Sequence, residues 1–241
     1  MKFGSLFSGI GGFDLGFERA GMECAWQCEI DEKANLVLEK HWPNVKRYGD
    51  IREVDFKTVS YIDVLCGGFP CQPHSVAGKR LASNDERDLW HEYKRAICEI
   101  KPKWIVAENV MGLLSSEGGR FFGGILKDLA ECGYDATWRV LRASQFGAIH
   151  KRERIYLIAN SNSQRIHGFW EKEIYRFSGL SWCKNVGGVE NLRRRSDIPK
   201  PIVRRYSNGF SIGMDRLKQS GNAVVPQIAE WIGKRIMEIE S

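Results

Sequence analysis

The sequence predicts an α/β protein with a doubly wound, mostly parallel sheet. In residues 1–160, short apolar runs typical of strands alternate with amphipathic stretches of helical spacing. Glycines, acidic residues and a proline-flanked cysteine follow the ends of several of these runs. Right-handed crossovers place helices on both faces of such a sheet and ligands at the carboxyl ends of its strands. We therefore expect the chemistry of this protein on the loops that follow the strands.

The individual elements follow from local signals. The first strand ends in a glycine turn, Gly21 closes the helix after it, and Asp31 is a favourable N-cap for a helix that stops before Pro43. The expected strands span residues 2–7, 22–30, 45–48, 62–66, 104–107, 136–141 and 154–159. One expected helix follows the glycine turn and ends near residue 20. The other expected helices span about 31–41, 87–100, 121–132 and 224–239.

Charge and composition change along the chain and suggest its organisation. Residues 1–150 carry 19 Lys and Arg against 21 Asp and Glu, a net of −2, whereas residues 151–241 carry 17 against 9, a net of +8. This asymmetry favours a polyanion as the partner of the second part, although a solvated basic surface would look the same. We expect a core at 1–160, a small basic lobe at 161–205 and a return to the core at 206–241.

The first candidate site is a glycine turn followed by two acidic residues at later strand ends. Gly9 and Gly11 fit a dinucleotide fingerprint, but Asp14 occupies the place of its third glycine. Glu29 ends the second strand, where an acid commonly holds a ribose, and Asp50 follows the third strand. A tight turn with surface acids is the alternative for each alone. Together they favour an adenosine-containing ligand without a pyrophosphate.

The second candidate site is Cys71, which Pro70 and Gln72-Pro73 flank. The prolines fix the backbone on either side, and the glycines at 67–68 permit a sharp exit from the strand. A thiol on such a stiff loop at the ligand edge is placed to act as a nucleophile. A buried structural cysteine is the usual alternative, and the Pro-Cys-Gln-Pro context argues against it.

The remaining composition excludes several classes of protein. The seven cysteines show no CxxC pair, so we expect no metal site and mostly reduced thiols that serve as small core side chains. No apolar run reaches the roughly 18–20 residues that cross a bilayer, and no leader is evident. These features predict a soluble, cytoplasmic protein with no membrane partner.

Taken together, the motifs resemble those of the DNA cytosine-5 methyltransferases, in the compact form seen in bacteria and phages. The resemblance extends over nearly the whole chain and keeps the family's order. The matching segments are Phe-Ser-Gly-Ile-Gly-Gly at 7–12, Pro-Cys-Gln at 70–72, Glu-Asn-Val at 108–110, Gln-Phe-Gly at 145–147, Arg-Glu-Arg-Ile-Tyr at 152–156 and Gly-Asn-Ala-Val-Val-Pro at 221–226. The resemblance implies a class I S-adenosylmethionine-dependent methyltransferase fold with a small C-terminal target-recognition lobe.

The resemblance also implies a role for each matching residue. Cys71 would add to carbon-6 of a cytosine flipped out of the duplex, and Glu108 would donate a proton or strong hydrogen bond to N3. Arg152 and Arg154 would anchor the catalytic loop, while the role of His150, which stands where the family has glutamine, stays open. Ion pairing at a strand edge is the alternative for the arginines. The S-adenosyl-L-methionine site would comprise Phe7, Gly9, Gly12, Glu29, Asp50, Pro70 and Asn222.

The basic lobe corresponds to the family's target-recognition region and implies double-stranded DNA as the partner. The phosphate-binding candidates are Arg193, Arg194, Arg195, Arg204 and Arg205. The lobe is short for the family, which limits how much DNA sequence it can distinguish. A cognate restriction endonuclease that acts separately is left open. The alternatives are an RNA cytosine-5 methyltransferase, whose usual Cys-Phe-Thr segment is absent here, and a non-catalytic DNA-binding relative, which an intact Cys71 and Glu108 oppose.

Overall fold

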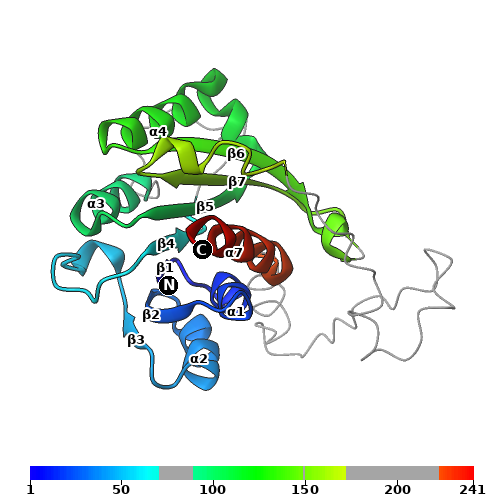
Figure 1. Ribbon diagram of the computed structural model, residues 1–241. Coiled ribbons are helices and arrows are strands. Elements are labelled where there is room, and N and C mark those ends of the chain that lie inside the picture. The colour runs from blue at the N-terminus through cyan, green and yellow to red at the C-terminus, as the bar shows by residue number, and fades with distance from the viewer. Residues whose placement is uncertain (71–88, 149, 172–222) are drawn as a thin grey trace, which may run out of the picture.

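A computed structural model describes residues 1–70, 89–148, 150–171 and 223–241 of the chain, and these residues form one mixed β-sheet covered by helices (Figure 1). Within these ranges the sheet has seven strands in the order β3-β2-β1-β4-β5-β7-β6. The strands are β1 (Lys2–Leu6), β2 (Glu23–Cys28), β3 (Lys46–Tyr48), β4 (Val64–Gly67), β5 (Trp104–Val110), β6 (Asp135–Arg142) and β7 (Glu153–Asn160). All seven predicted strands are confirmed, with ends that differ by a few residues.

The sheet is parallel except at β7, which runs antiparallel to both of its neighbours, β5 and β6. A parallel connection needs a crossover of a dozen or more residues. Only the short 3-10 turn η4 (Ala143–Phe146) and a few further residues separate β6 from β7, so β7 turns back beside β6. This antiparallel pairing places Glu108 of β5 directly opposite Tyr156 of β7.

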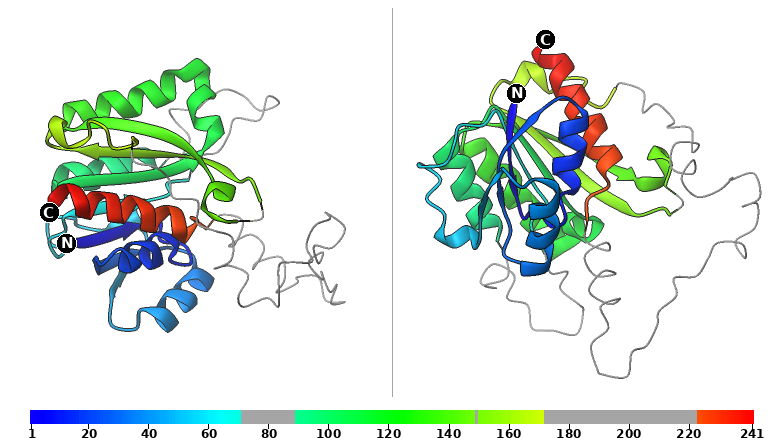
Figure 2. Two further views of the ribbon diagram at one scale, coloured as in Figure 1. Left: turned by 45° about the vertical axis from the view of Figure 1, so that its right-hand side comes forward. Right: turned by 90° about the horizontal axis from the view of Figure 1, so that it is seen from below.

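Helices cover both faces of the sheet, as predicted (Figure 2). Neighbouring residues along a strand point to opposite faces, so Val64 and Leu65 belong to different core clusters. The cluster with Val64 includes α1 (Gly12–Arg19) and α7 (Pro226–Glu240), and the cluster with Leu65 includes α3 (Trp90–Ile100) and α4 (Arg120–Glu131). The sheet is therefore buried on both sides, and only its edges and strand ends are open to ligands.

Local signals set the ends of two further elements near the first strands. The Asp31 carboxylate accepts hydrogen bonds from the amides of Lys33 and Ala34 at 2.8 and 3.0 Å, which confirms it as the N-cap of α2 (Glu32–His41). Asp50 similarly begins the short 3-10 turn η1 (Ile51–Glu53). Both acids follow strands that end at the same edge of the sheet.

The apolar spacing predicted the terminal helix α7, and the structure shows that it packs closely on α1. A Cβ atom on Gly16 would lie 2.4 Å from the Ala229 Cβ, and one on Gly233 would lie 2.8 Å from the Ala20 Cβ. Only glycine permits this approach, and it lets Ile232 reach the buried core. Helix α7 is thus an integral part of the core.

The basic lobe predicted at 161–205 lies largely outside the described residues, and its boundaries stay a prediction. Only its beginning is described, through the 3-10 turn η5 (Ser163–Arg165) to residue 171. None of the helices in the described ranges is both long and apolar enough to cross a membrane.

Candidate active site

A cavity of about 450 Å³ opens at the carboxyl ends of the central strands. Its walls come from the glycine turn after β1, the end of β2, the exit of β4, the end of β5, the start of β7 and the segment before α7. The residues that line it include Phe7, Gly9, Glu29, Pro70, Leu89, Glu108, Arg152, Arg154, Ala223 and Val224. The prediction that a site would form at this edge of the sheet agrees with the position of the cavity.

The glycine turn brings backbone amides to the cavity and fixes Glu29 beside them. Gly9 has a φ of 56°, a conformation that favours glycine, and its amide donates to Glu29 Oε2 at 2.7 Å. The amide of Asp31 donates to the other oxygen, Glu29 Oε1, at 2.8 Å. A Cβ on Gly12 would lie 2.4 Å from the Val224 carbonyl oxygen, so Gly12 allows the C-terminal return to close over the turn.

Asp14 does not face the cavity but points into the core beneath the turn. Its carboxylate accepts hydrogen bonds from Gln27 Nε2 at 2.8 Å, from the Ser5 hydroxyl at 3.1 Å and from the Cys24 thiol at 3.6 Å. Burial raises the pKa of Asp14 to about 6, and these hydrogen bonds oppose the rise. The residue that breaks the dinucleotide fingerprint therefore ties α1 to β1 and β2. No local pattern in the sequence indicates this role.

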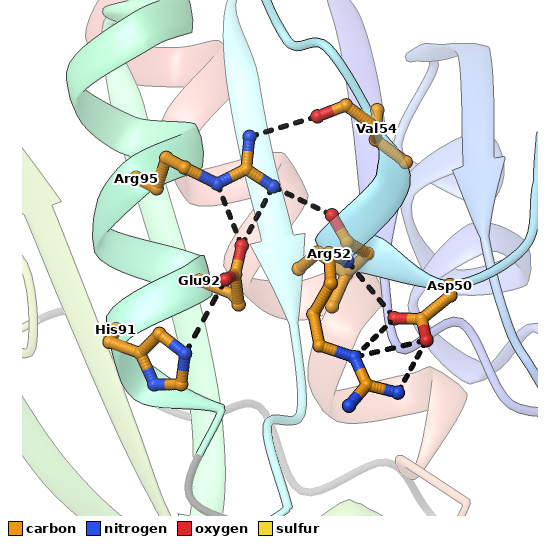
Figure 3. A network of polar contacts seen from close by, with 7 residues as sticks. Asp50, Arg52, Val54, His91, Glu92 and Arg95 are labelled. Atoms are coloured by element: carbon orange, nitrogen blue, oxygen red, sulfur yellow. Dashed lines mark hydrogen bonds and ion pairs between the residues drawn. The ribbon is translucent and has the colours of Figure 1, made fainter. Parts of the chain in front are cut away.

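Asp50 is held by its own neighbour and lies apart from the cavity lining. Arg52 Nε donates to the two Asp50 oxygens at 2.9 and 3.0 Å, and this contact lowers the pKa of Asp50 (Figure 3). Close by, Arg95 of α3 donates to the carbonyl oxygens of Ile51 and Val54 at 2.7 and 2.8 Å. Arg95 thus fastens the turn after Asp50 to the helix. The part of Asp50 in the S-adenosyl-L-methionine site stays a prediction.

Glu108 is the buried acid of the cavity. Only 7% of its surface is exposed, and Arg154 Nε lies 3.2 Å from its Oε1. Burial raises the pKa of Glu108 to about 7, while the charges of Arg154 and Arg152 act in the opposite direction. Arg152 Nη2 also donates to the Ala223 carbonyl oxygen at 2.9 Å, which links β7 to the C-terminal return. The structure therefore brings together three residues that the sequence assigned to one site.

Asn109 connects Glu108 to the loop that leads towards Cys71. Its Nδ2 donates to the Phe69 carbonyl oxygen at 3.0 Å, and its Oδ1 accepts from the Val110 amide at 2.8 Å. A Cβ on Gly68 would lie 3.0 Å from Glu108 Oε2, so glycine there lets the β4 exit pass close to the carboxyl group. The exposed Pro70 is the last described residue before the nucleophile candidate.

Several predicted site residues lie outside the described residues. They are Cys71, Asn222 and the five arginines Arg193, Arg194, Arg195, Arg204 and Arg205. His150 is described and exposed, and it is not part of the cavity lining. Among the described residues, no group of three or more His, Cys, Asp or Glu side chains is arranged to hold a metal ion.

The strand order, the reversed β7 and the cavity at the strand ends define a class I S-adenosylmethionine-dependent methyltransferase fold. A comparison with protein families identifies one family within this class. The model of the C-5 cytosine-specific DNA methylase family matches residues 1–188, and the chain belongs to that family.

Individual relatives agree with the family assignment. The chain is 39% identical over 173 residues to the Type II methyltransferase M.Bsp6I of Bacillus sp. (strain RFL6), covering 70% of this chain and 55% of the relative. It is 43% identical over 208 residues to the Type II methyltransferase M.Eco47II of Escherichia coli, covering 83% and 49%. The chain thus spans about half the length of these relatives.

A solved structure supports the same fold. A prophage-encoded protein of E. coli, described as a DNA modification methyltransferase, superimposes with a TM-score of 0.59 at 27% identity. The match covers 68% of this chain and 48% of that one.

Proposed function

We propose that this protein transfers a methyl group from S-adenosylmethionine to carbon-5 of cytosine in double-stranded DNA. The observation that carries the proposal is the environment of Glu108. This buried carboxyl group, whose pKa is raised to about 7 by burial, pairs with Arg154 and also experiences the charge of Arg152. It lines a cavity that also contains Pro70, the neighbour of Cys71. A carboxyl group of this pKa is half protonated near neutral pH and can supply a proton to a ring nitrogen. The description of the family as C-5 cytosine-specific DNA methylases supports this reaction, and the relatives are named as methyltransferases.

The cavity suits the cofactor in size and in chemistry. Its volume of about 450 Å³ is within the range of small-molecule sites, and it is lined by apolar groups with a few polar ones. The Gly9 and Asp31 amides fix the Glu29 carboxylate, whose remaining lone pairs can accept the two hydroxyls of a ribose. S-adenosylmethionine supplies an electrophilic methyl group when it is bound. We propose Phe7, Gly9, Gly12, Glu29, Asp50, Pro70 and Asn222 as its binding residues.

The chain's own residues would perform the activation of the base. The Cys71 thiolate forms a bond to carbon-6 of the ring while Glu108 gives its proton to N3, so that carbon-5 becomes electron-rich. After carbon-5 has accepted the methyl group, a base or water removes its hydrogen as a proton. The electron pair then restores the ring double bond, Cys71 leaves carbon-6 as a thiolate, and N3 loses its added proton. Arg154 and Arg152 would hold Glu108 in place throughout.

The target cytosine must leave the base stack, because Cys71 cannot reach carbon-6 inside a duplex. We propose that the basic lobe supports this step by neutralising phosphates through Arg193, Arg194, Arg195, Arg204 and Arg205. If Arg193 contacts a phosphate, Arg193→Ala will weaken DNA binding and flatten the dependence of log K on log salt by about one unit. An unchanged slope would remove Arg193 from the set.

The central test is the replacement of Cys71. Cys71→Ala should abolish methyl incorporation into DNA while calorimetry still detects S-adenosylmethionine binding. Unmethylated genomic DNA is the appropriate substrate, because its sequencing after conversion of unmethylated cytosines also reveals the recognised motif. Cys98→Ser is the matched control, since this thiol lies on an exposed part of α3.

A mechanism-based trap gives an independent result. An oligonucleotide with 5-fluorocytosine in that motif should form a stable covalent complex through Cys71, because fluorine at carbon-5 cannot leave as a proton does. Methyl transfer at the normal rate by Cys71→Ala, or an adduct on another residue, would contradict the mechanism. Incorporation of the methyl group into RNA but not into DNA would show that RNA is the substrate.

A further inference from the structure

Helices α3 and α4 lie side by side on one face of the sheet (Figure 1). They run in the same direction, because α3 precedes β5, α4 precedes β6, and both of these strands are antiparallel to β7. Three polar contacts join the two helices. Trp90 Nε1 donates to Asp128 Oδ2 at 2.8 Å, and Lys94 Nζ donates to Asp128 Oδ1 at 2.6 Å. Lys94 also pairs with Glu131 Oε2 at 3.2 Å. Side chains further along these facing stripes should therefore also meet.

One helical turn beyond these contacts, each helix presents a cysteine. Cys98 is four residues after Lys94, and Cys132, at the C-terminal cap of α4, is four residues after Asp128. Cys98 is close enough to Cys132 to contribute to the raised pKa of its thiol. Both are free; Cys98 is exposed and Cys132 is half-buried. This differs from Cys24, Cys28 and Cys66, which are buried as the sequence predicted.

The accessibility of the two sulfur atoms assigns them different parts in an oxidation. Oxidants in solvent reach the exposed Cys98 first. Burial raises the pKa of Cys132, so its sulfur reacts more slowly with an oxidant than an exposed thiol does and remains reduced until Cys98 has been oxidised. This division is the arrangement expected of an exposed reactive thiol beside a resolving thiol.

We propose that Cys98 and Cys132 are a reversible disulfide site that cross-links α3 to α4 under oxidation by a peroxide. The Cys98 thiolate attacks one oxygen of hydrogen peroxide and becomes a sulfenic acid as hydroxide leaves. The Cys132 sulfur then bonds to the Cys98 sulfur, and the sulfenic oxygen departs as water. Overall, two thiols and one hydrogen peroxide give one disulfide and two waters. A dithiol reductant reverses the reaction.

This site is separate from the cavity, so the proposal does not depend on the proposed methyl transfer. Cys98 is eight residues along α3 from Trp90, a rise of roughly 12 Å. Trp90 and Leu89 are at the cavity end of the helix, where the Trp90 ring lies 5.2 Å from that of Phe69. A disulfide between Cys98 and Cys132 would therefore join α3 and α4 at their C-terminal ends, away from the cavity.

The test uses the full chain, oxidised with hydrogen peroxide and then alkylated with N-ethylmaleimide. After digestion without reduction, mass spectrometry should detect a linked peptide containing Cys98 and Cys132, two hydrogens lighter than its separate parts and absent after dithiothreitol. The melting temperature of the oxidised protein should exceed that of the reduced protein by roughly 5–10 °C. Cys98→Ser and Cys132→Ser should each lose both the linked peptide and the shift.

Other outcomes would overturn the proposal. Alkylation of both residues after peroxide treatment would show that no bond forms between them. A sulfinic acid at Cys98 beside an alkylated Cys132 would show that Cys132 does not resolve it. A dominant link from Cys98 to Cys71 or Cys183 would assign the reactive pair elsewhere. The peptide map is read on the unsubstituted protein, so the result stands even if a serine variant folds poorly.

Discussion

Replacing Arg154 by methionine removes the cation nearest to the Glu108 carboxyl group and leaves a side chain of similar length. Arg154 Nε is 3.2 Å from Glu108 Oε1, and its charge is the largest influence that lowers the pKa of this acid. An opposite charge at such a distance lowers a carboxyl pKa by about 1–3 units. The value of about 7 should therefore rise to roughly 8–10 in Arg154→Met.

The sign of the effect on catalysis follows from the role of Glu108. A proton donor is active only while protonated, so methyl transfer should fall as the pH rises through the pKa of Glu108. In Arg154→Met this descending limb should move to higher pH by about 1–3 units. The maximal rate should also fall, because the carboxyl group loses its anchor.

The assay is the single-turnover rate of methyl transfer at saturating DNA and S-adenosylmethionine, measured from pH 5.5 to pH 10. Arg142→Met is the matched control, since Arg142 pairs with Glu153 at 2.6 Å on the exposed side of the same strand pair. Its pH profile should equal that of the unsubstituted protein. A descending limb that does not move in Arg154→Met would refute the assignment of that limb to Glu108.

Three further predictions concern the turn and the core beneath it. Asp14→Asn should raise the free energy of unfolding, measured by urea titration, by about 1–3 kcal/mol at pH 8 and by much less at pH 5. The reason is that the pKa of Asp14 is raised to about 6 in the folded protein, so the protein loses stability as the pH rises through that value and Asp14 ionises. A gain equal at both pH values would exclude ionisation as the cause. Gly12→Ala should lower the free energy of unfolding by about 1–3 kcal/mol, since its Cβ would meet the Val224 carbonyl, whereas Gly124→Ala, with open space around it in a helix, should raise it slightly. Glu29→Gln should weaken S-adenosylmethionine binding by roughly 10–100-fold in calorimetry, because an amide NH₂ would face a backbone N–H that now donates to a carboxylate; unchanged affinity would place the ribose elsewhere.

The sequence predicted the sheet well because its signals are local. Apolar runs, the Asp31 cap and glycines at helix ends each act within a few residues, so all seven strands and the helices near 31–41, 121–132 and 224–239 were found at nearly their true positions. The direction of β7 was not predicted, since periodicity is the same for parallel and antiparallel strands. The short connection after β6 was the available signal.

The candidate site was predictable where a motif fixed it and unpredictable where contacts are long-range. The partners of Asp14 come from two strands, so the sequence could show an acid in a glycine turn but not its burial. The Asp50–Arg52 pair, by contrast, is two residues apart and could have been anticipated. Cys98 directly follows the buried Ala96 and Ile97 on α3, and a helical projection would have placed it away from the apolar face.

The glycine turn after β1 and the segment before α7 meet at the candidate active site and form one unit there. The Ala223 carbonyl accepts from Arg152, and the next residue, Val224, closes over Gly12. Arg152 in turn acts on the pKa of Glu108. A displacement of the segment before α7 would therefore change both the glycine turn and the electrostatic environment of Glu108. Gly12→Ala should accordingly shift the descending limb of the pH profile as well as lower stability, whereas Gly124→Ala should leave the limb in place.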